Sequence, residues 1–298
     1  MKRTILLSIF ALLSFAVFPQ DDLMNLLGED SQPETEYTSA AFKANRIVLG
    51  QSIENSPNGA LAFVISHHFG PINDGWYEFW GLDQANIRFA FEYGINDWLQ
   101  VGVGRTSVEK IFDGAVKVKL LRQSTGLKKM PVSLSYYGSM GITSLEWSEP
   151  ERENYFSSRM TYVNQLLLAR KFNSSLTLQL TPTFIHRNLV ETEEDQNDVW
   201  SIGAGGRYKL SQRISLNLEY YYLLPGTTAD EYYNSFSFGV DIETGGHVFQ
   251  LFLTNSVAML EQQFIPETAG NWLDGDIHLG FNINRTFQIK KPKTVPEE

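Results

Sequence analysis

Apolar and polar side chains alternate with a period of two along most of the chain after about residue 44. The clearest run is RISLNLEYYYLL at 213–224, in which every second residue is Ile, Leu or Tyr and most residues between them are polar. The same pattern occurs at 86–93, 175–185, 235–242 and 277–284. Because successive residues of a strand point to opposite faces, this alternation predicts an all-β chain whose strands have one apolar and one polar face.

The length of the runs and of their connections indicates where these strands lie. Strands of soluble domains cluster near five or six residues, whereas a tilted strand that crosses a membrane needs about 9–11. The runs here are about ten residues or longer. Short connections at 94–97, 172–175, 210–212 and 244–246 alternate with long ones at 70–83, 143–158, 187–197, 225–233 and 255–274. We therefore expect a transmembrane antiparallel up-and-down β-barrel, with a soluble β-protein outside the cytoplasm as the alternative.

The number of strands is left open. Thirteen segments begin near residues 44, 59, 85, 97, 111, 130, 159, 175, 198, 213, 234, 247 and 275, within a predicted barrel domain of residues 44–289. A bacterial single-chain barrel has an even number of strands, so either residues 37–43 add a strand, giving fourteen, or one weak segment folds into a loop or the lumen, giving twelve.

The N-terminus predicts export. Lys2 and Arg3 precede the apolar stretch 5–18, which is shorter than the roughly 20 residues of a membrane-spanning helix. Residues 1–20 therefore indicate a cleaved signal peptide, with an N-terminal membrane anchor as the competing interpretation. We expect residues 21–43 to form a periplasmic segment or plug that begins with a short amphipathic helix, and residues 290–298 to form a polar tail.

Four stretches are informative together: FKANRIVLGQSIE with ISHHFG within 42–70, GLDQANIRFAFEYGINDWLQVGVGR at 81–105, GGHVFQLFLTNS at 245–256 and GFNINRTF at 280–287. They resemble an uncharacterised family of exported β-barrels from Gram-negative outer membranes, a domain of unknown function. The resemblance implies an outer-membrane barrel whose partners are the lipid bilayer and the barrel-assembly machinery. It implies no activity, substrate or catalytic residue. Many barrels end on an aromatic residue that the assembly machinery reads, whereas here Phe287 is followed by a polar tail.

Composition and motifs argue against several classes of function. The chain has 24 basic and 34 acidic side chains, a net charge of −10, which disfavours a nucleic-acid partner because phosphate binding needs a basic surface. It has no Cys, and neighbours such as His67 and His68 would point to opposite faces of a strand, so we expect no metal centre and no cofactor. No GxSxG motif is present. A barrel enzyme acting on lipids is therefore the least favoured interpretation, and we expect no enzymatic activity.

One predicted loop is rich in carboxylates. Residues 191–198 (ETEEDQND) contain five acidic side chains: Glu191, Glu193, Glu194, Asp195 and Asp198. Clustered carboxylate oxygens can bind a hard cation such as Ca²⁺, although this loop lacks the Gly and the spacing of a dedicated calcium loop. A solvated acidic loop is the alternative interpretation.

Strand parity also places charged side chains opposite the apolar faces: Arg88, Glu92, Lys117, Lys119, Glu219 and Asp241. In a barrel this face is the lumen, because a charge at the lipid midplane costs about 2–4 kcal/mol. A lumen of this size is too wide for wall side chains alone to fill. We expect a passive pore or binding barrel for small hydrophilic solutes, lined by these charges. The alternative is a closed structural or docking barrel for envelope partners, plugged by inward Tyr137 and Tyr221 and by Leu23, Leu26 and Leu27.

Aromatic side chains lie near the ends of several predicted strands: Trp98, Phe172, Trp200, Tyr208 and Tyr222. Aromatic rings favour the boundary between lipid and water, so we expect these residues to form the two belts of a membrane barrel.

Overall fold

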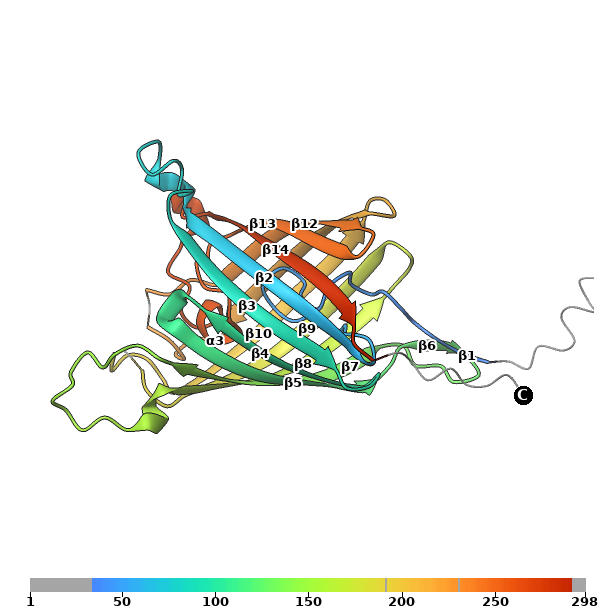
Figure 1. Cartoon of the computed structure of the whole chain (residues 1–298), viewed down its shortest axis with the longest axis horizontal. Helices are drawn as coiled ribbons and strands as arrows, with labels where there is room; N and C mark the ends of the chain where they lie inside the picture. The colour runs from blue at the N-terminus through green and yellow to red at the C-terminus, as the bar shows by residue number, and fades with distance from the viewer. Residues whose placement is uncertain (1–33, 191, 230, 291–298) are drawn as a thin grey trace, which may run out of the picture.

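The computed structural model describes residues 34–190, 192–229 and 231–290. They form a closed barrel of twelve antiparallel strands in which each strand pairs with the next along the chain and the last closes onto the first (Figure 1). The barrel strands are β2 (Ala60–Pro71), β3 (Ala85–Gly94), β4 (Leu99–Thr106), β5 (Ile111–Leu121), β7 (Ser133–Thr143), β8 (Met160–Lys171), β9 (Leu176–Arg187), β10 (Asp198–Lys209), β11 (Ile214–Leu223), β12 (Ser235–Thr244), β13 (His247–Thr254) and β14 (His278–Gln288).

The predicted fold class is confirmed, and of the two strand counts the structure has twelve. The strand expected near residue 44 is wrong: the wall begins at Ala60, and residues 44–57 fold back inside the barrel, so the predicted barrel domain 44–289 begins too early. A fourteenth strand does not form over 37–43, because β1 (Thr35–Tyr37) pairs with β6 (Ser124–Gly126) outside the barrel. The predicted signal peptide, Leu23, Leu26, Leu27 and the tail after Lys290 lie outside the described residues.

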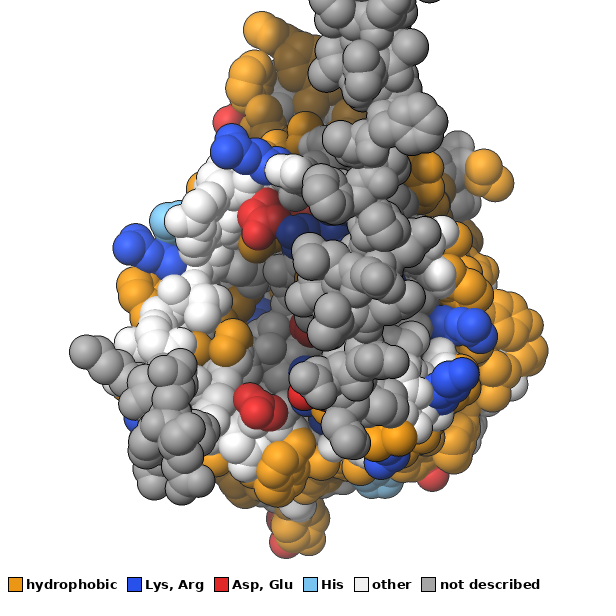
Figure 2. Space-filling model, turned by 90° about the vertical axis from the view of Figure 1, so that its right-hand side faces the viewer, with side chains coloured by type: hydrophobic (Ala, Val, Ile, Leu, Met, Phe, Trp, Pro, Cys, Tyr) orange, Lys and Arg blue, Asp and Glu red, His pale blue; other side chains and the backbone are white. Residues whose placement is uncertain are grey.

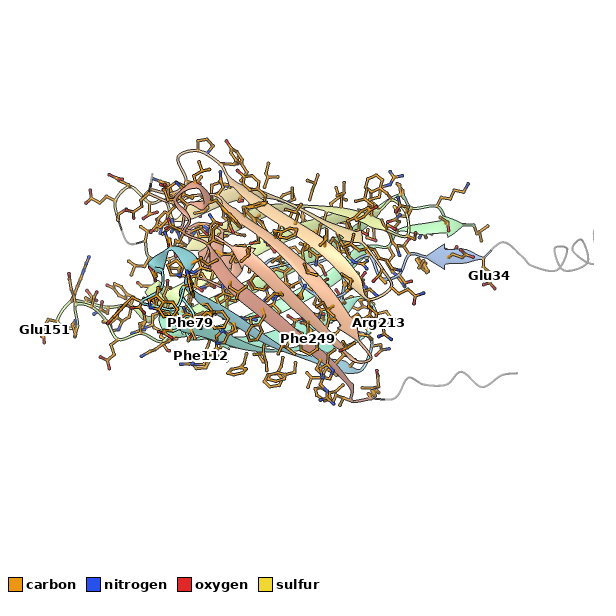
Figure 3. All side chains as sticks on the ribbon, turned by 90° about the horizontal axis from the view of Figure 1, so that it is seen from above. Glu34, Phe79, Phe112, Glu151, Arg213 and Phe249 are labelled. Carbon is orange, nitrogen blue, oxygen red and sulfur yellow. The ribbon has the colours of Figure 1, made fainter. Side chains whose placement is uncertain are left out.

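The alternation of the sequence places polar side chains on the lumen face of the wall and apolar side chains on its outer face. On β9, Gln179 and Thr181 are buried toward the lumen, whereas Leu178 and Leu180 point outward and are 47% and 50% exposed. Of the five aromatic residues expected in the belts, Phe172, Trp200, Tyr208 and Tyr222 are 43–53% exposed with outward parity, whereas Trp98 is 53% exposed in the turn before β4. Phe112 and Phe249 project from the same outer surface (Figure 3). The outside is therefore the apolar band that a bilayer requires.

The two ends of the barrel differ in their connections. Short turns join β3 to β4, β8 to β9, β10 to β11 and β12 to β13 at what we call the short-turn end, near Arg213 (Figure 3). Loops of ten residues or more join most strands at the long-loop end, where Glu151 lies, and contain the short helices η2 (Ile72–Asp74), η4 (Phe156–Arg159) and η5 (Trp272–Asp274). None of the described helices is long and apolar enough to cross a membrane.

Two segments fold into the lumen. The first, residues 38–57, enters from the short-turn end and is called the hairpin plug; it is the blue segment inside the barrel in Figure 1. The second, residues 255–268, enters from the long-loop end, contains α3 (Glu261–Phe264) and is called the inward loop. Ile47 and Val48 of the plug belong to the same buried apolar cluster as Phe264 and Ile265 of the inward loop.

Candidate functional site

The hairpin plug is a tight chain reversal with its tip at residues 47–50. The Ile47 N–H donates to the Gly50 carbonyl at 2.9 Å, and the Ser52 N–H donates to the Asn45 carbonyl at 2.8 Å. Gly50 is required at the tip because a Cβ there would lie 2.0 Å from Tyr221 Oη of the wall. The Tyr221 ring is buried and packs edge-on against Phe264 at 5.3 Å, so it has little room to yield.

Side chains of the wall bind the main chain of this tip. Glu219 accepts hydrogen bonds from the N–H groups of Gly50 at 2.9 Å and Val48 at 3.2 Å. Asn282 Nδ2 donates to the Val48 carbonyl at 3.0 Å, and Gln250 Nε2 donates to the Ile47 carbonyl at 3.1 Å. The tip is thus held from three strands, β11, β13 and β14.

Lys117 of β5 binds both arms of the hairpin. Its ammonium group donates to the carbonyls of Glu54 at 2.9 Å, Ser52 at 3.1 Å and Asn45 at 3.4 Å. From β9, three strands further round the wall, Gln179 Nε2 donates to the Gln51 carbonyl at 2.8 Å. A buried ammonium needs several acceptors, and here main-chain carbonyls of the plug provide them.

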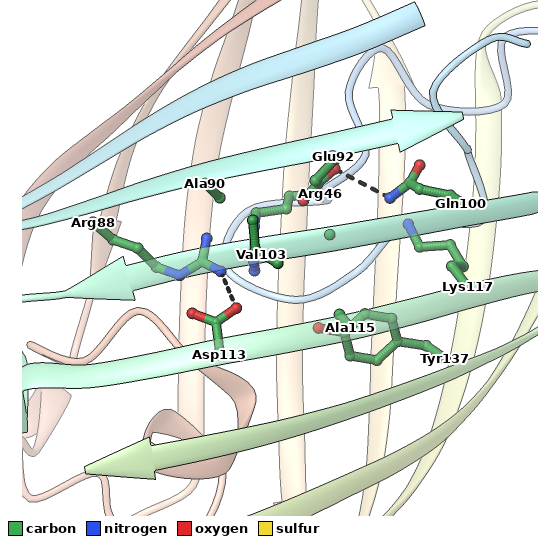
Figure 4. Close-up of a pocket in the computed structure, with 11 residues that line it drawn as sticks. Arg46, Arg88, Ala90, Glu92, Gln100, Val103, Asp113, Ala115, Lys117 and Tyr137 are labelled. Carbon is green, nitrogen blue, oxygen red and sulfur yellow. Dashed lines mark hydrogen bonds and ion pairs between the residues drawn. The ribbon is translucent and has the colours of Figure 1, made fainter. Parts of the chain in front are cut away.

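Charged side chains join the plug to the inward loop and to the wall, and Figure 4 shows Arg46 of the plug beside the charged residues of the wall. Arg46 Nη1 lies 3.1 Å from Glu261 Oε1, and both side chains are at least 97% buried. Beside them, Arg88 and Asp113 form an ion pair within the wall at 2.6 Å. Glu92 accepts from Asn45 Nδ2 of the plug at 2.6 Å. The space enclosed among these groups is about 10 Å³, which is room for about one water molecule.

The inward loop closes the long-loop end of the lumen. Arg187 on β9 lies 2.8 Å from Glu267 Oε1 and 3.3 Å from Asp195 Oδ1, so one buried guanidinium links the inward loop to the loop between β9 and β10. At the short-turn end a recess of about 340 Å³ remains beside the plug, lined in part by Lys43, Glu54 and Glu243. Viewed from that end, acidic side chains lie inside the apolar outer surface, and several Lys and Arg side chains lie around the rim (Figure 2).

The structure brings most of the predicted lumen charges together around the plug. Arg88, Glu92, Lys117, Glu219 and Asp241 are all at least 92% buried inside the barrel, and Lys119 is half-buried in a recess with Glu54. Sequence reasoning missed Asp113 and Arg207, although both have lumen parity in their strands, and it missed Arg46 and Glu261. Neither of the last two lies in an alternating run, so no periodic signal marked them.

The acidic loop does not converge on one point. Asp195 binds Arg187 and also accepts from Thr192 Oγ1, while Asp198 turns to the outside of the barrel and Glu193 and Glu194 are exposed. Glu191 lies outside the described residues. Within the described ranges, no group of three or more His, Asp or Glu side chains is arranged to hold a metal ion.

The histidines of the described ranges do not form a shared site. His67 stacks on Phe281 at 5.1 Å, whereas buried His68 contacts the Ser256 carbonyl through Nδ1, so the two rings lie on opposite faces of β2 as expected. On the outer face, His186 Nδ1 lies 2.6 Å from Asp198 Oδ1. This resembles two members of a catalytic triad, but among the hydrogen bonds of the described residues no serine hydroxyl meets His186.

A model of the membrane-bound beta barrel domain DUF5777 matches residues 42–287. The chain belongs to this family. The predicted family resemblance is therefore confirmed, and the protein is a membrane-bound β-barrel. The DUF5777 match begins at Phe42, so it includes the tip and both arms of the hairpin plug as well as the wall.

Solved structures of channels are similar to this DUF5777 barrel. The NanC porin is 8% identical, with 76% of this chain and 98% of that one covered and a TM-score of 0.48. The KdgM porin is 8% identical over the same shares, with a TM-score of 0.45. An outer membrane channel from Pseudomonas putida F1 is 14% identical, with 79% and 98% covered and a TM-score of 0.44. A search of the curated proteins finds no match.

Proposed function

We propose that this protein is an outer-membrane channel for small hydrophilic solutes, closed by the hairpin plug and the inward loop. The short-turn end, where the plug enters, faces the periplasm, and the long loops face the outside of the cell, as in other outer-membrane barrels. Solutes pass when the plug leaves the lumen. The protein carries out no chemical reaction on them.

The main support for this proposal is the polarity of the lumen-facing side of the wall around the plug. β9 presents Thr177, Gln179, Thr181 and Thr183 to the lumen, and β11 presents Ser215, Asn217 and Glu219. A barrel that only had to stay closed could be filled by apolar side chains, since replacing buried ion pairs by packed hydrophobic residues is often neutral or stabilising. A wall of hydroxyl, amide and charged groups suits a lumen that is hydrated in another state.

Unpaired polar atoms in the closed lumen support the same conclusion. Arg88 Nε, Asp113 Oδ1, Gln165 Oε1 and Asn217 Oδ1 are buried on the wall and have no hydrogen-bond partner within the described part of the chain. Each such group costs about 1–3 kcal/mol when it is left unpaired. Water in an open lumen would satisfy all of them, which offsets part of the cost of releasing the plug.

A closed structural barrel for envelope partners is the second candidate. It is favoured by the apolar cluster that the plug and the inward loop share, including Val48 and Phe264. The two candidates differ in one property, because only a channel has an open state.

Planar-bilayer recordings of Gly50→Val test the channel. Valine at this position cannot be seated against buried Tyr221, so we expect the tip to leave its site and stepwise conductance to appear where wild type is closed for most of the time. Gly114→Ala is the matched control, since a Cβ there has nothing within 4 Å. If Gly50→Val folds, as judged by heat-modifiable migration on a gel, and stays silent, the structural candidate is the better one.

A reversible disulfide between the plug and the wall tests whether movement of the plug opens the channel. A Cβ on Gly205 would lie 3.5 Å from Ile47 Cγ2, so Ile47→Cys with Gly205→Cys places two thiols within reach in a chain with no other Cys. Combined with a destabilised plug, the oxidised pair should stay closed, and a reductant should restore conductance.

A further inference from the structure

The wall recognises the main chain of the hairpin plug more than its side chains. Wall donors bind the plug carbonyls of ten residues: Ser39, Ala40, Ala41, Asn45, Arg46, Ile47, Val48, Gln51, Ser52 and Glu54. Wall acceptors bind the plug N–H groups of Val48 and Gly50 through Glu219 and of Ser56 through Gln100. Donors therefore face carbonyls, and acceptors face N–H groups.

These main-chain contacts surround the lumen. Besides Lys117 and Glu219, they come from Gln100 on β4, where Oε1 accepts from the Ser56 N–H at 2.6 Å, and from Arg207 on β10, where Nη1 donates to the Ala41 carbonyl at 3.2 Å. Gln179, Gln250 and Asn282 add contacts from β9, β13 and β14. At the short-turn end, Lys171 of β8 also donates to the Ser39 carbonyl at 2.8 Å. The backbone of a chain in the lumen is thus bound from eight of the strands described.

Direct bonds between plug side chains and the wall are fewer. Asn45 Nδ2 donates to Glu92, and Lys43 pairs with Glu243 at the short-turn end. Arg46 and Gln51 reach Glu261, which belongs to the inward loop and not to the wall. Most hydrogen bonds from the wall therefore go to main-chain N–H and carbonyl groups, which every peptide carries.

We propose that the open lumen is a binding site for short peptides and that the hairpin plug is a tethered peptide occupying it. This inference rests on the proposed channel and names its class of solute. The tether gives the plug an effective concentration in the millimolar range, so a free peptide binds only where the plug has been displaced. The tip geometry further requires a residue without a side chain opposite Tyr221.

Binding to Gly50→Val protein in detergent, measured by fluorescence anisotropy, tests the proposal without requiring conductance. The probe is a labelled peptide of residues 44–56 with its natural Gly50, and the same peptide N-methylated at Val48 and Gly50 lacks both hydrogen bonds to Glu219. We expect N-methylation to weaken binding at least about tenfold, because hydrogen bonds to charged groups are the stronger ones. Replacing Asn55 of the peptide by Ala should weaken it less, because the Asn55 side-chain amide has no hydrogen-bond partner among the described residues.

A linear maltooligosaccharide of similar length, offered as competitor, distinguishes peptides from other hydrophilic solutes. We expect the oligosaccharide to displace the labelled peptide at least about tenfold less well than unlabelled peptide does. We also expect Lys117→Met, introduced into the Gly50→Val protein, to weaken peptide binding. Equal competition by the oligosaccharide, or equal binding of the N-methylated peptide, overturns the proposal. A Gly50→Val channel that conducts but binds no peptide overturns this inference alone, whereas peptide binding to a barrel that never conducts supports it and contradicts only the channel.

Discussion

Glu219 is the wall residue on which the tip of the plug most depends. It accepts two main-chain N–H groups, those of Val48 and Gly50. In Glu219→Leu both N–H groups stay buried without an acceptor, at about 1–3 kcal/mol each. We expect the open probability in bilayer recordings to rise at least about tenfold. Ser237→Ala is the control, because the Ser237 hydroxyl bonds Thr254 and not the plug. An open probability equal to that of the control would contradict the role assigned to Glu219.

Lys117 and Lys119 point to the lumen side of β5 and set its charge near the short-turn end. In the Gly50→Val background, changing both residues to Glu replaces two positive charges by two negative ones. Rings of charge in a pore select ions of opposite sign, so we expect the reversal potential in a salt gradient to shift toward cation preference. An unchanged reversal potential would show that ions take a path away from these residues.

At the scale of elements, the hairpin plug and the inward loop act as one closure because Arg46 and Glu261 pair where they meet. Breaking a buried ion pair from one side costs about 3–5 kcal/mol, whereas replacing both partners by apolar residues is often nearly neutral. We expect Glu261→Leu to lower the temperature of the heat-modifiable gel transition, and Arg46→Leu with Glu261→Leu to recover part of the loss. Strictly additive effects of the two substitutions would contradict the coupling.

The wall strands could be predicted because one face of each meets lipid and the other meets polar surroundings, as Leu178 and Gln179 show on β9. The plug could not, because it touches only the inside of the barrel and has no two-sided environment. Its apolar residues Ile47–Leu49 stand in a row, and Gly50 and Pro57 interrupt the segment. These departures from alternation were the available signal that residues 44–57 are not a wall strand.

At the scale of the molecule, parity placed Arg88, Glu92 and Glu219 inside the barrel, but the sequence left open whether their partners are water or protein. The partners of Glu219 are more than 160 residues away in the chain, and Arg46 meets Glu261 across 215 residues. Contacts at such separation depend on closure of the whole barrel, which is why single-strand patterns did not reveal them.

The membrane position of the whole barrel predicts how its tryptophans respond to quenchers. Trp98 lies in a short turn and Trp200 on the outer face near the long-loop end, and both are about half exposed, whereas Trp76 is 75% exposed on a long loop. Aromatic rings at the ends of wall strands lie at the boundary between lipid and water. In single-Trp variants reconstituted in vesicles, we expect bromolipids labelled at interfacial depth to quench Trp98 and Trp200, and aqueous iodide to quench Trp76 more than either. Cell fractionation should recover the protein with the outer membrane. Equal iodide quenching of all three tryptophans would mean that the apolar outer wall does not face lipid. That result would contradict the proposed outer-membrane channel.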